Sequence, residues 1–126
     1  MKRAIVGIDS PTTGGFGIVV YRPWKKRQRN RWKRVPYQKL PAYDSRNRQL
    51  AWWSFTLQTV LAKAKPVAVV SERTPFGAVG MRKVGILMSE CVGVLKGILG
   101  MPALSKITLH EYSPATVQKI VAGHGR

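Results

Sequence analysis

One short apolar run constrains the fold of this chain more than any other feature. Residues 67–70 are all apolar, and they follow Lys65-Pro66, a pair that ends a helix. Continuous apolar runs of this length are typical of strands that are buried on both faces of a sheet. Segments with helical spacing flank the run, so the pattern favours a buried strand between two helices.

Three segments are predicted to be helices. The first is capped by Asp44 or Ser45, and its apolar residues recur at steps of three and four: Leu50, Trp53, Leu57, Val60, Leu61 and Ala64. The second spans residues 81–99 and has the same spacing in Val84, Leu87, Met88, Cys91, Val92, Leu95 and Leu99. The third opens at Ser113-Pro114, with serine as cap and proline at the first helical position, and Gly123 closes it.

Four more segments are predicted to be strands. They are residues 2–8, ended by Asp9 and a turn-rich stretch; residues 17–21, which complete a hairpin; residues 31–37, as an edge strand; and residues 107–111. The order of strands and helices predicts an α/β fold, a mixed sheet flanked by helices. The length of 126 residues is that of one domain, here residues 1–126.

Positive charge dominates the composition. Twenty-two Lys and Arg stand against five Asp and Glu, which gives a net charge of +17. Such a field attracts polyanions, of which nucleic acid is the commonest. Ribosomal-type structural proteins share this balance, so charge indicates nucleic-acid binding without indicating cleavage.

Half of the basic residues lie in residues 22–48, which we call the basic arm. Tryptophans and tyrosines are interleaved among them, so the arm could track phosphates while its tryptophans stack on exposed bases. The alternative is a solvated, flexible arm whose aromatic rings pack on the sheet. The residues predicted to bind DNA here are Lys25, Lys26, Arg27, Arg29, Arg31, Lys33 and Arg34.

Several classes of protein are disfavoured by the sequence. No stretch has the pattern of a signal peptide, and no apolar run approaches the ~20 residues of a membrane span. No helix combines a basic face with an aromatic apolar face, so we expect no membrane partner. The single Cys91 excludes an internal disulfide and a cysteine zinc cluster, and it favours the reducing cytoplasm.

Two of the five acids stand where active sites of α/β proteins collect. Asp9 follows the first predicted strand and Glu72 follows the central one. Sites form outside the carboxyl ends of such strands, and adjacent parallel strands would bring the two carboxylates together. They would repel unless a cation lay between them, and oxygen ligands suit Mg²⁺ or Mn²⁺. The alternative is that Asp9 caps a turn while Glu72 pairs with Arg73 or a lysine.

Three motifs, in order, resemble those of RuvC-type resolvases in the RNase H-like nuclease superfamily. The first is Ala4-Ile5-Val6-Gly7-Ile8-Asp9-Ser10, then Gly17-Ile18-Val19-Val20 after six residues; the second is Val69-Val70-Ser71-Glu72 before a short loop with an aromatic; the third is the segment Tyr112 to Gly125 with its Gly-x-Gly turn. The first motif alone is shared with many ATPases and kinases, but the three together are fairly specific.

The resemblance implies an RNase H-like fold, with Asp9 and Glu72 as catalytic ligands of Mg²⁺ or Mn²⁺. It implies an endonuclease that resolves four-way (Holliday) DNA junctions by paired nicks, in recombination and repair, as a homodimer formed through residues 81–99. The family carries one or two further metal-binding acids on a helix after the Gly-x-Gly turn, so we expect those ligands to lie beyond Arg126. Further expected DNA contacts are Arg73, Phe76, Arg82, Lys83 and Lys119.

Two other readings remain open. A basic nucleic-acid-binding protein without catalysis predicts that Asp9→Asn and Glu72→Gln leave function intact. Another RNase H-like enzyme, such as a transposase or an RNA–DNA hybrid nuclease, would differ in its substrate preference.

Overall fold

The computed structural model describes residues 2–12, 15–42, 45–72 and 82–112. The backbone alone is described at Thr12, Tyr37, Gln38 and residues 82–85. The elements are β1 (Ala4–Thr12), β2 (Gly15–Tyr21), α1 (Gln28–Arg31), β3 (Trp32–Gln38), α2 (Arg46–Ala64), β4 (Pro66–Glu72), α3 (Arg82–Leu99), the 3₁₀ turn η1 (Pro102–Leu104) and β5 (Thr108–Tyr112).

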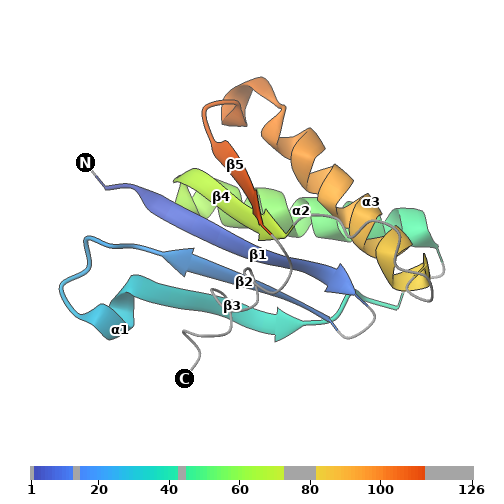
Figure 1. The fold of residues 1–126 in the computed structure, drawn as a ribbon, viewed down its shortest axis with the longest axis horizontal. Helices are drawn as coiled ribbons and strands as arrows, with labels where there is room; N and C mark the ends of the chain where they lie inside the picture. Colours follow the sequence, from blue (N-terminus) through green and yellow to red (C-terminus); the bar gives the residue numbers. More distant parts are fainter. Residues whose placement is uncertain (1, 13–14, 43–44, 73–81, 113–126) are drawn as a thin grey trace.

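These strands form one mixed sheet in the order β3-β2-β1-β4-β5 (Figure 1). β1, β2 and β3 are antiparallel neighbours, whereas β4 runs parallel to β1, and β5 runs parallel to β4. The parallel pairs follow from the helical crossovers, because α2 connects β3 to β4 and α3 connects β4 to β5. The predicted α/β architecture is therefore confirmed.

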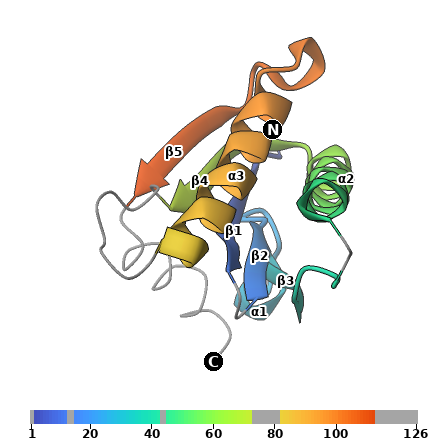
Figure 2. The same cartoon turned by 90° about the vertical axis from the view of Figure 1, so that its right-hand side faces the viewer.

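Both long helices pack on the same face of the sheet, as Figures 1 and 2 show. In β1 the buried residues Ala4, Val6 and Ile8 point toward the helices. Because side chains alternate along a strand, Ile5, Gly7 and Asp9 point to the opposite face. This alternation decides on which side of the sheet the acids lie.

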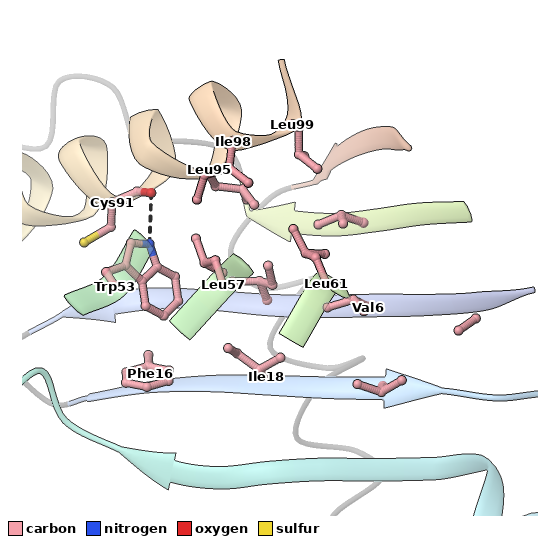
Figure 3. Close-up of a cluster of buried hydrophobic side chains, with 14 of the residues drawn as sticks. Val6, Phe16, Ile18, Trp53, Leu57, Leu61, Cys91, Leu95, Ile98 and Leu99 are labelled. Carbon is pink, nitrogen blue, oxygen red and sulfur yellow. Dashed lines mark hydrogen bonds between the residues drawn. The ribbon is translucent and has the colours of Figure 1, made fainter. Parts of the chain in front are cut away.

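The core is anchored by Trp53 of α2, which is fully buried (Figure 3). Its ring meets Phe16 of β2 edge-on, with the ring centroids 5.0 Å apart, and its Nε1 donates a hydrogen bond to the carbonyl of Cys91 in α3, 3.1 Å away. A buried indole needs such an acceptor. One side chain therefore joins the sheet to both helices.

Local signals fix the ends of α2. The Ser45 hydroxyl accepts a hydrogen bond from the Arg48 backbone N–H at 3.3 Å, so serine provides the predicted cap. At the other end Lys65 takes a left-handed conformation (φ 49°), and its N–H donates to the carbonyl of Leu61. The chain then turns directly into β4 at Pro66.

Two sequence-based expectations about the elements were wrong, and one short helix was missed. β1 continues through Asp9 to Thr12, because the hairpin with β2 still pairs Thr12 with Gly15. Val67 is 40% exposed, so β4 is not buried on both faces along its whole length. The basic arm contains the short helix α1, which the sequence did not indicate. The third predicted helix, residues 113–123, lies outside the described residues.

Candidate active site

The parallel pairing of β1 with β4 brings Asp9 and Glu72 together. Gly7 pairs with Val70 and Ile8 pairs with Ser71, so the next residues along, Asp9 and Glu72, stand side by side. Val69 packs in the core, so Glu72 points, like Asp9, away from the helices. The expected juxtaposition of the two carboxyl groups is what this register produces.

Glu72 is almost entirely buried, with 1% of its surface exposed. Its Oε1 accepts a hydrogen bond from the Ser10 backbone N–H at 3.0 Å. Its Oε2 is buried and has no hydrogen-bond partner among the described residues. A buried carboxylate oxygen without a donor is costly, so this atom is poised to bind a ligand.

The two carboxyl groups raise the cost of ionising one another. Burial, followed by repulsion from Asp9 and a hydrogen bond with it, raises the pKa of Glu72 to about 7. Burial also raises the pKa of Asp9 above its usual value. Both groups accept but do not donate when ionised, so sharing a hydrogen bond requires a proton on one of them. Near neutral pH a proton or a cation is needed to stabilise the pair.

A divalent cation fits this pair of acids. Two carboxylates supply the oxygen ligands that Mg²⁺ and Mn²⁺ prefer, and Oε2 of Glu72 is the unpartnered donor atom. No group of three or more His, Cys, Asp and Glu side chains gathers within the described part of the chain. Asp9 and Glu72 by themselves supply two carboxyl groups, and their assignment as metal ligands stays a prediction.

The remaining acids are engaged elsewhere, in the parts of the chain that the structure describes. Glu90 of α3 forms an ion pair with Arg46 of α2 at 2.8 Å, which ties the two helices together. Glu111 of β5 pairs with Lys96 at 3.1 Å. Asp44 falls outside the described residues. Neither Glu90 nor Glu111 joins Asp9 and Glu72.

The first part of the basic arm, residues 22–31 with α1, lies at the other end of the sheet from the carboxylates (Figure 1), and β3 then runs back along the sheet. Asp9 pairs with Gly17 at the start of β2, whereas the arm begins after Tyr21, which pairs with Ile5. Ile5 lies four residues before Asp9 along β1, which corresponds to a distance of about 13 Å. The sequence predicted DNA contacts at both places, and the structure shows that they are two separate regions.

The arm forms an open polar cavity at the surface, which sequence reasoning did not predict. It measures about 470 Å³ and is lined by Arg22, Lys25, Arg29, Asn30, Trp32 and Lys33. Arg22 and Asn30 were missed as candidates. The dense spacing of cations around Trp32 was the available signal, but the turn that folds them around one space was not readable from the sequence.

Other predicted contacts lie where the structure gives no side-chain description. Arg73, Phe76 and Lys119 are outside the described residues, and Arg82 and Lys83 open α3 with their side chains undescribed. Lys26, Arg27, Arg31, Lys33 and Arg34 belong to the arm or to β3. All of these contacts stay predictions.

Two features bear on alternative chemistries. Burial raises the pKa of the Cys91 thiol to about 12, which removes it as a nucleophile at neutral pH. None of the helices in the described part of the chain is long and apolar enough to cross a bilayer.

Comparisons with known proteins identify the fold. No protein-family model matches the sequence, and no curated protein matches it significantly. Thermus thermophilus RuvC in complex with a Holliday junction substrate has a TM-score of 0.66 at 15% identity, over 93% of this chain and 68% of that chain. Another Thermus thermophilus RuvC structure has a TM-score of 0.56 at 20% identity, over 98% and 71%.

The yeast mitochondrial Holliday junction resolvase Ydc2 has a TM-score of 0.60 at 14% identity. The match covers 92% of this chain and 54% of Ydc2, so this chain spans about half of that protein. These likenesses agree with the strand order and with the helices on one face. The chain therefore has the RNase H-like α/β fold of RuvC-type resolvases.

Proposed function

We propose that this protein is a divalent-metal-dependent endonuclease that resolves four-way DNA junctions by nicking. The observation that carries the proposal is the pair of carboxyl groups of Asp9 and Glu72 where the parallel pairing of β1 with β4 ends, with one buried oxygen of Glu72 that has no hydrogen-bond partner among the described residues. The fold supports it, because the similar solved structures include a RuvC bound to a Holliday junction substrate. The net charge of +17 supports a DNA substrate.

Asp9 and Glu72 would hold Mg²⁺ or Mn²⁺. When bound, such an ion supplies Lewis-acid stabilisation of the phosphoryl transition state and lowers the pKa of water. The chain positions its own ligands for this. The Ser10 N–H fixes Oε1 of Glu72, while Oε2 has no hydrogen-bond partner among the described residues, and both carboxyl groups must lose their protons to hold the ion.

The basic residues of the arm would bind phosphates away from the cut. Lys25, Lys26, Arg27 and Arg29 are exposed, and none of them is in an ion pair within the described ranges. A region at least about 13 Å from the carboxylates corresponds to roughly four base pairs of duplex rise. The arm would therefore extend the footprint along one limb of the junction.

A homodimer stays part of the proposal. Most of the described apolar residues of α3, including Leu87, Cys91 and Leu95, are buried within the chain. Ile86, 58% exposed, is the large apolar side chain of α3 that the described surface leaves open. A two-fold dimer would still match the two-fold symmetry of a junction.

The test is cleavage of a labelled four-way junction by the parent protein and by Asp9→Asn, with Mg²⁺ and with Mn²⁺. We expect symmetric nicks from the parent and a loss of at least about a thousandfold in rate for the variant. Binding should persist or tighten, because one negative charge facing the phosphates is removed. A linear duplex of equal length, with competitor DNA present, serves as the substrate control.

The same experiment separates the alternatives. Nicking by Asp9→Asn at the parent's rate would contradict the metal-site assignment. Tight junction binding by the parent without any nicks would favour a non-catalytic nucleic-acid-binding protein. Equal preference for linear duplex or for an RNA–DNA hybrid would favour another RNase H-like enzyme.

A further inference from the structure

We infer that the cavity of the basic arm is a binding pocket for one unpaired nucleotide of a DNA strand, separate from the carboxylate pair. Its volume of about 470 Å³ lies within the range of small-ligand sites. The inference rests on the proposed function only in taking DNA as the ligand. Its test needs neither metal nor cleavage.

Among the described residues, no acidic side chain pairs with the cations of this pocket. The side chains of Arg22, Lys25 and Arg29, like that of Lys33, form neither an ion pair nor a hydrogen bond within the described part of the chain. Of the acids described there, Glu90 and Glu111 pair with other basic residues, and Asp9 and Glu72 face one another. Four cations that line one concave space raise the positive potential there, which attracts anions, and a phosphate is the anion that nucleic acid supplies.

The pocket is held open by the backbone of the arm. The Arg22 N–H donates to the carbonyl of Arg31 at 2.6 Å, and this hydrogen bond joins the two ends of the segment 22–31. The Arg31 Nε donates to the carbonyl of Lys25 at 2.9 Å, and the Asn30 N–H donates to the carbonyl of Arg27 at 2.9 Å. These bonds fix the backbone of the turn and the short helix α1, so the framework of the pocket exists before a ligand arrives, and the remaining ordering cost is that of the long Lys and Arg side chains.

Trp32 adds a flat apolar wall beside the cations. Its ring contacts that of Tyr21, with the centroids 4.1 Å apart, and the indole also lines a second cavity of about 250 Å³ with Ile5, Gly7 and Val19. A base whose ring faces are already stacked inside a duplex cannot use such a wall. An unpaired base can stack on it, while the Asn30 amide can donate to and accept from its polar edge.

The cations and the indole together favour an unpaired nucleotide as the ligand of the pocket. A surface of lysines alone would track the convex backbone of a duplex, but a concave pocket with an indole favours one splayed nucleotide. Tyr21 pairs with Trp32 and with Ile5, four residues before Asp9, so the bound nucleotide would lie at least about 13 Å from the carboxylates.

The test measures binding of a fluorescein-labelled short oligothymidylate by anisotropy in EDTA. Three ligands are compared: the oligothymidylate, an abasic strand with the same number of phosphates, and a blunt duplex. Lys25→Gln with Arg29→Gln removes two pocket charges. Lys26→Gln with Arg27→Gln is the matched control, because it removes two charges from the same arm outside the lining.

We expect the pocket variant to lose about tenfold or more in affinity for oligothymidylate, and the control to lose at most about threefold. The salt dependence of the pocket variant should fall by about 1.4 in slope, the value for two phosphate contacts to a single strand. Equal losses in the two variants would overturn the pocket and leave only a diffuse basic surface.

Trp32→Leu tests the stacking. It should lower the affinity for oligothymidylate about tenfold, as expected for one stacked base, and leave the abasic strand almost unchanged. An equal effect on both strands would overturn base recognition, and thermal melting checks that the variant folds. Displacement of oligothymidylate by millimolar thymidine monophosphate would reassign the pocket to free nucleotides and overturn its assignment to a strand.

Failure here is separable from failure of the proposed function. Asp9→Asn leaves the pocket intact, so it should bind oligothymidylate as the parent does. If the parent binds oligothymidylate in the pocket but does not nick junctions, the proposed function is wrong. If the parent nicks junctions but the pocket variant binds oligothymidylate as well as the control does, the pocket assignment is wrong.

Discussion

The two ends of the sheet carry opposite charge in opposite settings. At one end Asp9 and Glu72 are brought together by strand register, and Glu72 is 1% exposed. At the other end Lys25 and Arg29 are exposed, and no acid in the described part of the chain faces them. Burial makes the charge of the first pair expensive, whereas water screens the charges of the arm.

The contrast indicates that the two regions have different roles, one in catalysis and the other in binding. Two buried carboxylates repel one another, and a bound cation relieves this repulsion, so the pair suits metal-dependent catalysis. Exposed cations cost the fold little and are free to meet phosphates, so they suit binding. Substitutions at the first end should therefore change rate and stability, and those at the second should change affinity alone.

The largest expected effect separates rate from affinity. Glu72→Gln should lower single-turnover nicking of a four-way junction by at least about a thousandfold without weakening binding. Lys25→Gln with Arg29→Gln should weaken binding, and it should leave the nicking rate unchanged at saturating protein. A rate loss in the arm variant at saturation would break the division between the two ends.

The next effect is a change in the free energy of unfolding with pH, measured in EDTA so that no divalent metal is bound. The folded Glu72 holds its proton up to about pH 7, while the unfolded carboxyl loses it near its ordinary pKa of 4.5. The unfolded state therefore binds fewer protons, so the free energy of unfolding should fall by roughly 2 to 3 kcal/mol as pH rises through this window. Urea unfolding at several pH values measures it, and Glu72→Gln should flatten the profile. A parent profile as flat as that of the variant would show that Glu72 ionises normally.

A cation should restore part of that loss. MgCl₂ at about 5 mM, near pH 8, should raise the free energy of unfolding by about 1 kcal/mol, the value for a site with a Kd of about 1 mM. Thermal unfolding with and without MgCl₂ tests it, with Asp9→Asn as the control that should lose the gain. The same gain in Asp9→Asn would place the cation elsewhere.

The smallest effect is expected at the arm end. Lys25→Gln with Arg29→Gln should change the free energy of unfolding by less than about 0.5 kcal/mol, because the charges are exposed and unpaired within the described residues. Urea unfolding of the metal-free variant measures it. A change above about 1 kcal/mol would mean that the arm supports the fold and is not only a binding surface.

Much of the fold could be predicted from local pattern. Helical spacing located α2 and α3, Ser45 was one of the two expected caps, and Lys65-Pro66 ended α2 as expected. The end of β1 could not be predicted, because its last residues remain extended through pairing with β2 and not through apolar character. The short helix α1 was missed because four polar and basic residues carry no hydrophobic period.

The sequence by itself determined which residues could do chemistry and binding. Asp9 and Glu72 ended or nearly ended apolar runs in a chain with few acids, and the cations clustered around aromatic residues. These are properties of neighbours along the chain, so they can be read without a structure.

Only the tertiary structure decided which residues meet. Parallel pairing put Asp9 beside Glu72 across 62 intervening residues, and it buried Glu72 enough to raise its pKa. The antiparallel hairpin placed the first part of the basic arm, residues 22–31, at the other end of the sheet, where six residues of the arm line one cavity. Register and the direction of strands set these distances, because side chains remote in sequence become neighbours only through backbone pairing across the sheet.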